Sequence, residues 1–354
     1  MQVRVLVVGL GNMGLSHARA YHSIEGFEIA GLCSRDVAAR PEIAAEFPGV
    51  PQFDDYARAL AAVRPDAVSI NTWPDTHAAF ARAALAANAH VFIEKPLAQT
   101  VAEAEEIVAL AQAARRKLMI GYILRVHPSW AKFVEIGRTL GKPLVMRMNL
   151  NQQSSGAQWA THKKLMETVS PIVDCGVHYV DVMCQVTGAR PLRVHALGAR
   201  LSQDIAPTMY NYGCLQVAFD DGSVGWYEAG WGPMMSETAF FVKDMIGPNG
   251  AVSIAVNESA TASSDIDSHT KTNALRLHHA RLDGDGRLAA RDEILAMEDE
   301  PGHQELCNRE QRAFLKAIRD DEDLTEHARG AIDSLRIVLA ADESIRTGKV
   351  VALA

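Results

Sequence analysis

The sequence predicts an α/β fold followed by an α+β part, and three observations lead to this fold class. Strand and helix patterns alternate over residues 1–124, which is typical of a parallel sheet with helices on both faces. Beyond residue 124, strand patterns follow one another with little helix between them, which indicates a mostly antiparallel sheet. A glycine motif stands between the first strand and the first helix. The N-terminal part is therefore predicted to be a Rossmann domain.

The first element is an apolar, β-branched run at residues 3–8, which leads into Gly9-Leu10-Gly11-Asn12-Met13-Gly14 and a stretch of helical composition. The first glycine of such a motif permits a tight turn, the second lets the backbone approach a pyrophosphate, and the third allows close packing of helix on strand. The flanking strand and helix supply the context that the motif requires. The predicted dinucleotide contacts here are Gly9, Gly11, Asn12, Met13 and Gly14.

The second predicted strand, residues 27–33, ends where a carboxylate would hold the ribose diol of NAD. Ser34 and Arg35 follow it. A hydroxyl and a guanidinium suit a 2′-phosphate, so both residues are predicted cofactor contacts and NADP(H) is favoured over NAD(H). The alternative is that Arg35 is a solvated loop residue and Asp36 holds the ribose.

The sheet continues through predicted strands at residues 66–72, 90–93 and 118–124 and helices at 76–87 and 100–116. Ligands of open parallel sheets bind beyond the carboxyl ends of the strands. Thr72, Trp73 and His77 follow one such end and are predicted cofactor contacts. The Trp73 ring would stack on the nicotinamide or on a sugar face, or else fill a domain interface.

Glu94-Lys95-Pro96 follows another strand end and completes the predicted cofactor contacts. Its position places Lys95 near the nicotinamide end of a bound dinucleotide. An ammonium there can donate to a substrate oxygen and stabilise the charge that develops during hydride transfer. The competing interpretation is a solvated surface lysine.

Asp174 and His178 lie in a segment with helical spacing of apolar residues, so they are expected to share one helix face. Imidazole titrates nearest to neutral pH and can take the proton of an alcohol as hydride leaves. The alternatives are a polar pair on a solvated helix or a buried histidine satisfied by backbone. His77, His127 and His162 are further histidines that could reach a cleft.

The second part is predicted to contain five strands, a hairpin turn at 220–222, a polar loop or irregular hairpin at 257–272 and two final helices. The predicted strands are 144–151, 193–201, 213–219, 223–230 and a run around 240–242, and the helices are 304–319 and 326–347. A chain of 354 residues exceeds what one core usually supports. We predict a dinucleotide-binding domain at 1–124 and a substrate-binding and oligomerisation domain at 125–354, and we allow for the last helices packing back on the first domain.

Composition excludes several classes of function. The chain has 35 Lys and Arg against 43 Asp and Glu, a net charge of -8, without a basic block, so nucleic acid is not an expected partner. No leader precedes the first strand and no apolar run approaches the ~20 residues that span a bilayer, which predicts a cytoplasmic protein. The 5 cysteines lack ligand spacing, which favours free thiols and no metal.

Four motifs occur together in this order: the glycine motif, Glu94-Lys95-Pro96, Gly121-Tyr122-x-x-Arg125 and Asp174-x-Gly176-x-His178. Over essentially the whole chain, this combination resembles the family of glucose-fructose oxidoreductase, inositol dehydrogenase and rhizopine catabolism protein (Gfo/Idh/MocA). The resemblance implies a Rossmann domain, a second domain with a large open antiparallel sheet used for oligomer contacts, and a site between the two. A homodimer or homotetramer is expected.

The resemblance also implies roles for single residues. Lys95 would bind and polarise the reacting oxygen, His178 would be the acid/base, and Asp174 would hold a substrate hydroxyl and assist His178. Pro96 would pack near the nicotinamide. The other expected substrate contacts are Tyr122, Arg125, Trp159 and His162. Tyr122 and Arg125 would line the cleft, Arg125 in a structural or substrate-orienting role. Trp159 and His162 lie with Lys163 in a segment that varies within the family and is expected to set the choice of substrate.

The predicted activity is a reversible NAD(P)-dependent oxidation of a secondary alcohol on a cyclic polyol, sugar or sugar derivative. Members of the inositol type often carry an acid where Ser34 stands, so their preference for NAD is not transferred. One alternative is reduction of a non-sugar carbonyl or diol on the same scaffold. Another is a non-catalytic, dinucleotide-sensing regulator, against which the retained Lys95, Asp174 and His178 speak.

Overall fold

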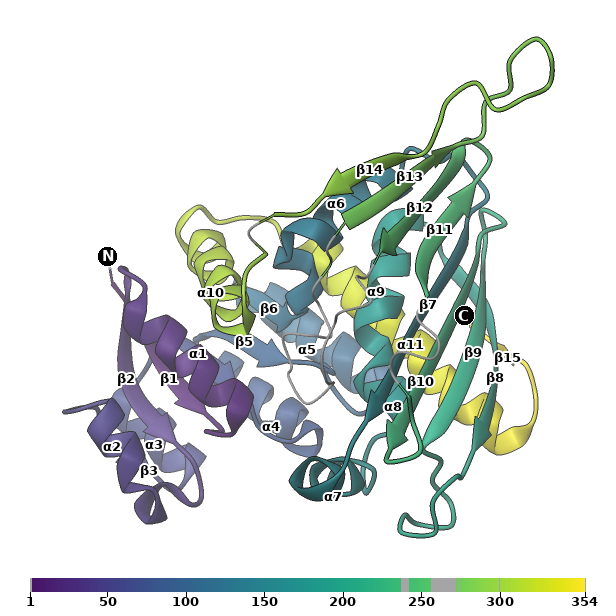
Figure 1. The fold of residues 1–354 in the computed structure, drawn as a ribbon. Helices are drawn as coiled ribbons and strands as arrows, with labels where there is room; N and C mark the ends of the chain where they lie inside the picture. Colours follow the sequence, from purple (N-terminus) through teal and green to yellow (C-terminus); the bar gives the residue numbers. More distant parts are fainter. Residues whose placement is uncertain (1, 237–241, 256–271, 273, 299, 354) are drawn as a thin grey trace. The chain divides into compact units, whose positions relative to one another are not determined.

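The computed structural model describes residues 2–236, 242–255, 272, 274–298 and 300–353, and the chain divides into two compact units (Figure 1). The first unit comprises Met1–Ile123 and His303–Ile332, and the second comprises Leu124–Gly302 and Asp333–Ala354. The assignment of a cofactor role to one part and a substrate role to the other stays a prediction. Within the described ranges, no helix has both the length and the apolar character needed to cross a bilayer.

The first unit contains a six-stranded sheet in which every pairing is parallel, in the order β3-β2-β1-β4-β5-β6. This order is that of dinucleotide-binding folds, so the predicted Rossmann fold is confirmed. Helices cover both faces, which is why the central strands are almost continuously buried. The strands are β1 (Val3–Val8), β2 (Phe27–Cys33), β3 (Gln52–Phe53), β4 (Ala67–Ile70), β5 (His90–Glu94) and β6 (Leu118–Gly121).

The helices of the N-terminal part follow the strands in alternation, as the sequence indicates. Two of them begin with a side-chain cap: Asp55 accepts from the backbone N–H of Arg58, and Thr100 accepts from that of Glu103. Such caps satisfy N–H groups that the helix itself leaves without partners. The helices are α1 (Asn12–Ser23), α2 (Pro41–Glu46), α3 (Tyr56–Val63), α4 (Pro74–Ala86) and α5 (Val101–Ala113).

Helix α10 (His303–Arg319) belongs to the first unit although it comes from the far end of the chain. It packs on α1, where the Gln304 amide donates to the carbonyl of Ser16 over 2.9 Å. Phe314 is fully buried in the core of this unit, with its ring centroid 6.0 Å from that of Phe92. The first unit is therefore assembled from two parts of the chain.

The second unit is built on a nine-stranded sheet in the order β14-β13-β12-β11-β7-β10-β9-β8-β15. Its pairings are antiparallel except for β7 with β10, so the predicted mostly antiparallel sheet is confirmed. The predicted hairpin joins β9 to β10, where Gly222 has a φ of 82°. The strands are β7 (Val145–Gln153), β8 (Pro191–Ala199), β9 (Tyr212–Phe219), β10 (Val224–Gly232), β11 (Lys243–Gly247), β12 (Gly250–Ala255), β13 (Ala274–His279), β14 (Glu293–Ala296) and β15 (Val351–Ala352).

Several elements of this unit differ from the expectation. The sequence reasoning missed the strands β12 to β15 and the helices α6 and α7, whose apolar patterns are short. Of the run around 240–242, residues 240 and 241 lie outside the described residues, as does the polar segment 257–272 except for Thr272. The helices outside α10 are α6 (Pro128–Gly137), α7 (Gly156–Leu165), α8 (Pro171–Asp174), α9 (Gly176–Thr187) and α11 (Thr325–Thr347), of which α11 runs from the first unit into the second.

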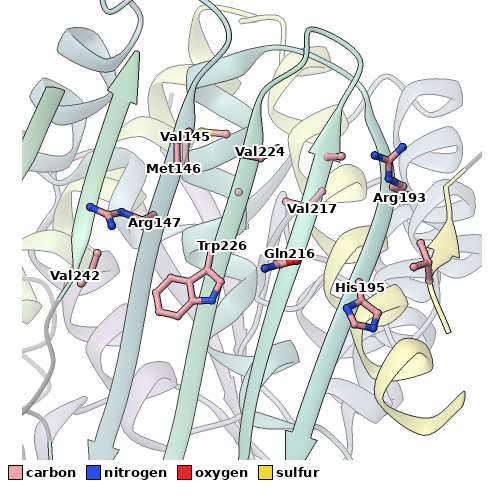
Figure 2. A pocket seen from close by; sticks show the side chains of 13 residues that line it. Val145, Met146, Arg147, Arg193, His195, Gln216, Val217, Val224, Trp226 and Val242 are labelled. Carbon is pink, nitrogen blue, oxygen red and sulfur yellow. The ribbon is translucent and has the colours of Figure 1, made fainter. Parts of the chain in front are cut away.

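The two faces of the nine-stranded sheet differ in character. Along β7, Met146 and Met148 are buried, whereas Val145 and Arg147 between them are exposed, as expected for a period of two. Figure 2 shows side chains on this second face, including the half-buried Trp226 of β10 and His195 of β8. They line a hollow of about 830 Å³. One face thus carries the core of the unit and the other lies open.

Candidate functional site

The glycine motif forms a close-packed cradle at the carboxyl end of β1. Gly9 has a φ of 83°, and a Cβ on it would lie 2.5 Å from the carbonyl oxygen of Asn71. A Cβ on Gly14 would lie 1.7 Å from the carbonyl oxygen of Gly9. A Cβ on Gly11 would meet no described atom within 4 Å, so this position faces open space. The predicted contacts Asn12 and Met13 open α1, whose first N–H groups can bind a phosphate. The cradle therefore fits a pyrophosphate.

The end of β2 carries charges of both signs. The Ser34 hydroxyl donates to the carboxylate of Asp36, and this bond lowers the pKa of Asp36. Arg35 is exposed. Arg40 was missed by sequence reasoning, because it reaches back 30 positions: its Nη1 donates to the carbonyl of Leu10 over 2.6 Å. Arg40 Nε also donates to Glu42 Oε1 over 3.1 Å, so this group holds two guanidinium groups and the carboxylates of Asp36 and Glu42.

The loop after β4 is tied to the turn after β5 by His77. This ring is fully buried, with its Nδ1 2.7 Å from the carbonyl of Pro96 and its Nε2 3.1 Å from that of Thr72. Burial lowers the pKa of His77, which favours a neutral ring with one N–H. Trp73, in contrast, is 42% exposed. The His77 ring is thus enclosed by protein, and a contact of His77 with a cofactor stays a prediction.

Glu94, Lys95 and Pro96 stand at the same carboxyl edge of the sheet as the glycine cradle. Glu94 is the last residue of β5 and is buried, whereas Lys95 is half-buried. The backbone N–H of Lys95 donates to Glu94 Oε2 over 3.2 Å. The parallel sheet thus gathers the predicted cofactor contacts of four loops, those after β1, β2, β4 and β5, as open sheets of this topology do.

The predicted single helix through Asp174 and His178 is wrong in one respect. Asp174 is the last residue of α8, Cys175 lies between, and α9 begins at Gly176. A Cβ on Gly176 would lie 2.9 Å from Cε1 of Tyr227, so close packing on β10 accompanies the break. The N–H of His178 donates to the carbonyl of Cys175 over 3.2 Å, which keeps the segment compact. Both predicted groups are half-buried at this junction.

Helix α7 packs beside this junction. Trp159 lies in one apolar cluster with Cys175 and Trp231. The His162 ring stacks on that of Trp231 with centroids 4.5 Å apart and an interplanar angle of 14°. Gln152 was missed by sequence reasoning; its Oε1 accepts from Trp231 Nε1 over 2.6 Å and from Cys175 Sγ over 3.2 Å. The structure therefore brings Trp159 and His162 to the segment that holds Asp174 and His178.

Arg125 and Tyr122, the other predicted substrate contacts, lie in different units. Arg125 Nε donates to Asp181 Oδ2 over 2.8 Å, and Nη2 donates to the second oxygen of that carboxylate. Asp181 is buried on α9, so this bidentate pair anchors the helix that carries His178. Tyr122 is buried in the first unit, with its ring centroid 6.3 Å from that of His327. Substrate contact by either residue stays a prediction.

One group of potential metal ligands occurs within the described part of the chain: His17, Cys307 and Glu310, all buried. Their ligand atoms lie within 4.8 Å of one another. His17 already uses both ring nitrogens, at 2.8 Å from Glu94 Oε1 and at 2.9 Å from the Gln311 amide nitrogen. We therefore assign His17 to a hydrogen-bond network.

Two domain-family models match the chain. Residues 3–122 match "Oxidoreductase family, NAD-binding Rossmann fold", and residues 135–242 match "GFO/IDH/MocA C-terminal domain". The chain belongs to the Gfo/Idh/MocA family. This membership confirms the resemblance carried by the four motifs and places an NAD-binding Rossmann fold at the N-terminus.

Relatives in the Gfo/Idh/MocA family include sugar and polyol dehydrogenases. The chain is 32% identical to a UDP-N-acetylglucosamine 3-dehydrogenase of Acidithiobacillus ferrooxidans over 206 residues. The alignment covers 58% of this chain and 61% of that protein. It is 28% identical over 189 residues to an inositol 2-dehydrogenase of Salmonella typhimurium, 52% of this chain and 54% of that protein. The chain thus matches between half and two thirds of the length of these relatives.

Solved structures of Gfo/Idh/MocA proteins share the fold over the whole chain. The structure of the Acidithiobacillus ferrooxidans dehydrogenase aligns with a TM-score of 0.75 at 24% identity, covering 98% of both chains. That of a scyllo-inositol dehydrogenase from Lactobacillus casei aligns with a TM-score of 0.74 at 21% identity, covering 99% of this chain and 98% of the other. At these identities the likeness establishes the fold.

Proposed function

We propose that the protein is an NAD(P)-dependent dehydrogenase that reversibly oxidises a secondary alcohol of a cyclic polyol, sugar or sugar derivative. The observation that carries this proposal is Lys95, a half-buried ammonium at the carboxyl edge of the sheet that also bears the glycine cradle. The names of the sugar and inositol dehydrogenases among its relatives support the substrate class.

In the proposed reaction the substrate hydroxyl loses a hydride and a proton. The glycine cradle would hold a nicotinamide dinucleotide, which when bound would supply the hydride acceptor. Lys95 binds the reacting oxygen and stabilises the charge that develops on it. His178 takes the hydroxyl proton and returns it in the reverse direction. Asp174 holds a neighbouring hydroxyl and assists His178, and its place at the α8–α9 junction supports this pairing.

The substrate is proposed to be selected by α7. Trp159 and His162 pack with Cys175 and Trp231, and Cys175 follows Asp174 directly. A change in α7 would therefore reach the acid/base segment through packing. Lys163 of the same helix has its Nζ 5.7 Å from the Trp159 ring centroid. We propose that Tyr122 and Arg125 line the substrate site, Arg125 chiefly by holding α9 through Asp181.

The experiment that tests the function is a fluorescence titration with NADPH and NADH, followed by absorbance at the nicotinamide band with a panel of inositols, aldoses and nucleotide sugars. We expect binding of a dinucleotide and turnover of at least one cyclic polyol or sugar. Turnover confined to non-sugar carbonyls or diols would replace the substrate class. Tight binding without turnover of any compound would instead point to a dinucleotide-sensing regulator.

NADP(H) is proposed as the preferred cofactor, on the basis of the Ser34 hydroxyl and the guanidinium groups of Arg35 and Arg40. Replacing Arg35 by alanine should weaken NADPH binding about tenfold, the loss of one charge-assisted hydrogen bond, and leave NADH binding within about twofold. Parallel fluorescence titrations of the two dinucleotides measure this change.

The matched control for cofactor preference is Asp36→Asn, which removes the carboxylate that accepts from the Ser34 hydroxyl. NADH binding should be unchanged by it if a 2′-phosphate is the intended ligand. A loss of NADH affinity of about tenfold would show instead that Asp36 holds the ribose diol, and the preference would be for NAD(H).

A homodimer or homotetramer through the open face of the nine-stranded sheet is proposed as the assembly. Val145 and Val224 expose apolar side chains on this face, around the hollow in Figure 2. Apolar surface of this kind is commonly covered by a partner. Light scattering of the purified protein measures the assembly, and a monomer at micromolar concentration would reject it.

A further inference from the structure

A buried hydrogen-bond network lies directly behind the turn that carries Lys95. Glu94 is 7% exposed, and its Oε1 lies 2.8 Å from Nε2 of His17 on α1. Its other oxygen accepts from the backbone N–H of Lys95 over 3.2 Å. One carboxylate therefore joins a side chain of α1 to the backbone of residue 95.

The proton on His17 is placed by Gln311. The amide nitrogen of Gln311 lies 2.9 Å from His17 Nδ1, and both side chains are fully buried. An amide N–H that donates to Nδ1 leaves the ring proton on Nε2. His17 therefore donates to Glu94, and the ring serves as a bridge between helix α10 and the carboxylate.

A second buried acid, Glu310, lies near this network and differs from Glu94. Its carboxylate has no hydrogen-bond partner within the described part of the chain. Burial, and then the charge of Glu94, raise the pKa of Glu310 well above its usual value. Glu94, which receives two N–H groups, is the acid that holds the negative charge. Glu310 is a neutral neighbour outside the chain of hydrogen bonds.

The turn is also held on its other side. His77 Nδ1 lies 2.7 Å from the carbonyl oxygen of Pro96, and the His77 ring is fully buried. A buried histidine thus contacts each of the residues that flank Lys95: His17 contacts Glu94, and His77 contacts Pro96. Both rings belong to the first unit; His17 holds the Glu94 carboxylate and His77 holds the backbone carbonyl of Pro96.

We propose that His17 and Gln311 are positioning residues that orient Lys95 through the Glu94 carboxylate. The inference rests on the proposed function, in which Lys95 binds the reacting oxygen. A catalytic group must be held within about 0.5 Å of its working position, and a fixed carboxylate one residue before Lys95 can supply that restraint. The assignment extends the proposed site into α10, which no motif indicates.

The test compares His17→Leu with His17→Gln in the full-length protein, on the substrate that the panel identifies. Glutamine keeps an N–H near the position of Nε2, and leucine does not. His17→Leu should lower kcat about 30-fold, with the KM for substrate and the Kd for dinucleotide within about threefold, because orientation and not binding is lost. His17→Gln should retain at least about a third of wild-type kcat.

Two further variants complete the design. Gln311→Met removes the donor to His17 at similar volume and should lower kcat about tenfold, which keeps the test available if His17→Leu does not fold. Glu310→Gln is the matched control, since it replaces a neutral acid with a neutral amide and should leave kcat within about twofold. Circular dichroism melting curves identify variants that are merely unfolded.

The outcomes separate this inference from the proposed function. If no substrate is turned over, or Lys95 proves dispensable, the proposed function fails. If Lys95 is required but His17→Leu and His17→Gln have equal kcat, the positioning role is overturned. It is also overturned if elemental analysis finds one zinc per chain that His17→Leu removes, since the cluster of His17, Cys307 and Glu310 would then be a metal site.

Discussion

Replacing Lys95 by methionine should lower kcat about a thousandfold, while the dissociation constant of the dinucleotide changes by less than about twofold. Methionine keeps a chain of similar length but has no N–H to donate to the reacting oxygen. Charge that develops on that oxygen would then be left to water or to neutral groups. Steady-state kinetics and a fluorescence titration of the same preparation measure the two quantities.

The control for Lys95 is Lys316→Met. Lys316 is another lysine of the first unit, on the exposed surface of α10, with Nζ 3.4 Å from Asp320. Exposed ion pairs contribute little, so kcat should stay within about twofold. A Lys95→Met enzyme that works within about threefold of the wild-type rate would remove Lys95 from the chemistry.

The Gly14→Ala substitution is expected to weaken dinucleotide binding at least about a hundredfold. A Cβ at this position would lie 1.7 Å from the carbonyl oxygen of Gly9, so either the loop or helix α1 must move. Movement of either displaces the N–H groups that are proposed to hold the pyrophosphate. The melting temperature should also fall, because backbone and not a flexible side chain is in the way.

Gly11→Ala separates the two effects. Since a Cβ there would meet no described atom within 4 Å, the melting temperature should equal that of the wild type. Dinucleotide binding should still weaken, because the methyl group would occupy the space assigned to the pyrophosphate. Unchanged affinity in Gly11→Ala would show that the phosphates do not lie against this part of the loop.

The sequence predicted those parts of the fold whose signals are local. The strand and helix alternation of the first 124 residues, the glycine turn and the last two helices follow from patterns within ten to twenty residues. The parallel pairing of β7 with β10 could not be predicted, since it joins residues 145–153 to 224–232 and depends on the whole sheet. Short helices such as α7 were missed because their apolar faces are narrow.

In the candidate site too, residues marked by local patterns could be predicted from the sequence, and contacts between distant parts of the chain could not. Lys95 and Glu94 are marked by a strand end, and Asp174 and His178 by their spacing. Nothing in the sequence joins His17 to Gln311, which lie 294 positions apart and meet only in the folded chain. The break between α8 and α9 was equally hidden, because it accompanies the approach of Gly176 to Tyr227.

The contribution of α10 to the first unit has a consequence for how the protein is made. When the ribosome has completed the six strands of the parallel sheet, His17 still lacks Gln311 and the core still lacks Phe314. About 200 further residues must be synthesised before α10 is complete and can dock, by the numbering of β6 and α10. At a translation rate of roughly 5–20 residues per second, the nascent sheet waits roughly 10 to 40 seconds with an unfilled apolar face. During that interval the exposed apolar face makes the nascent chain prone to aggregation.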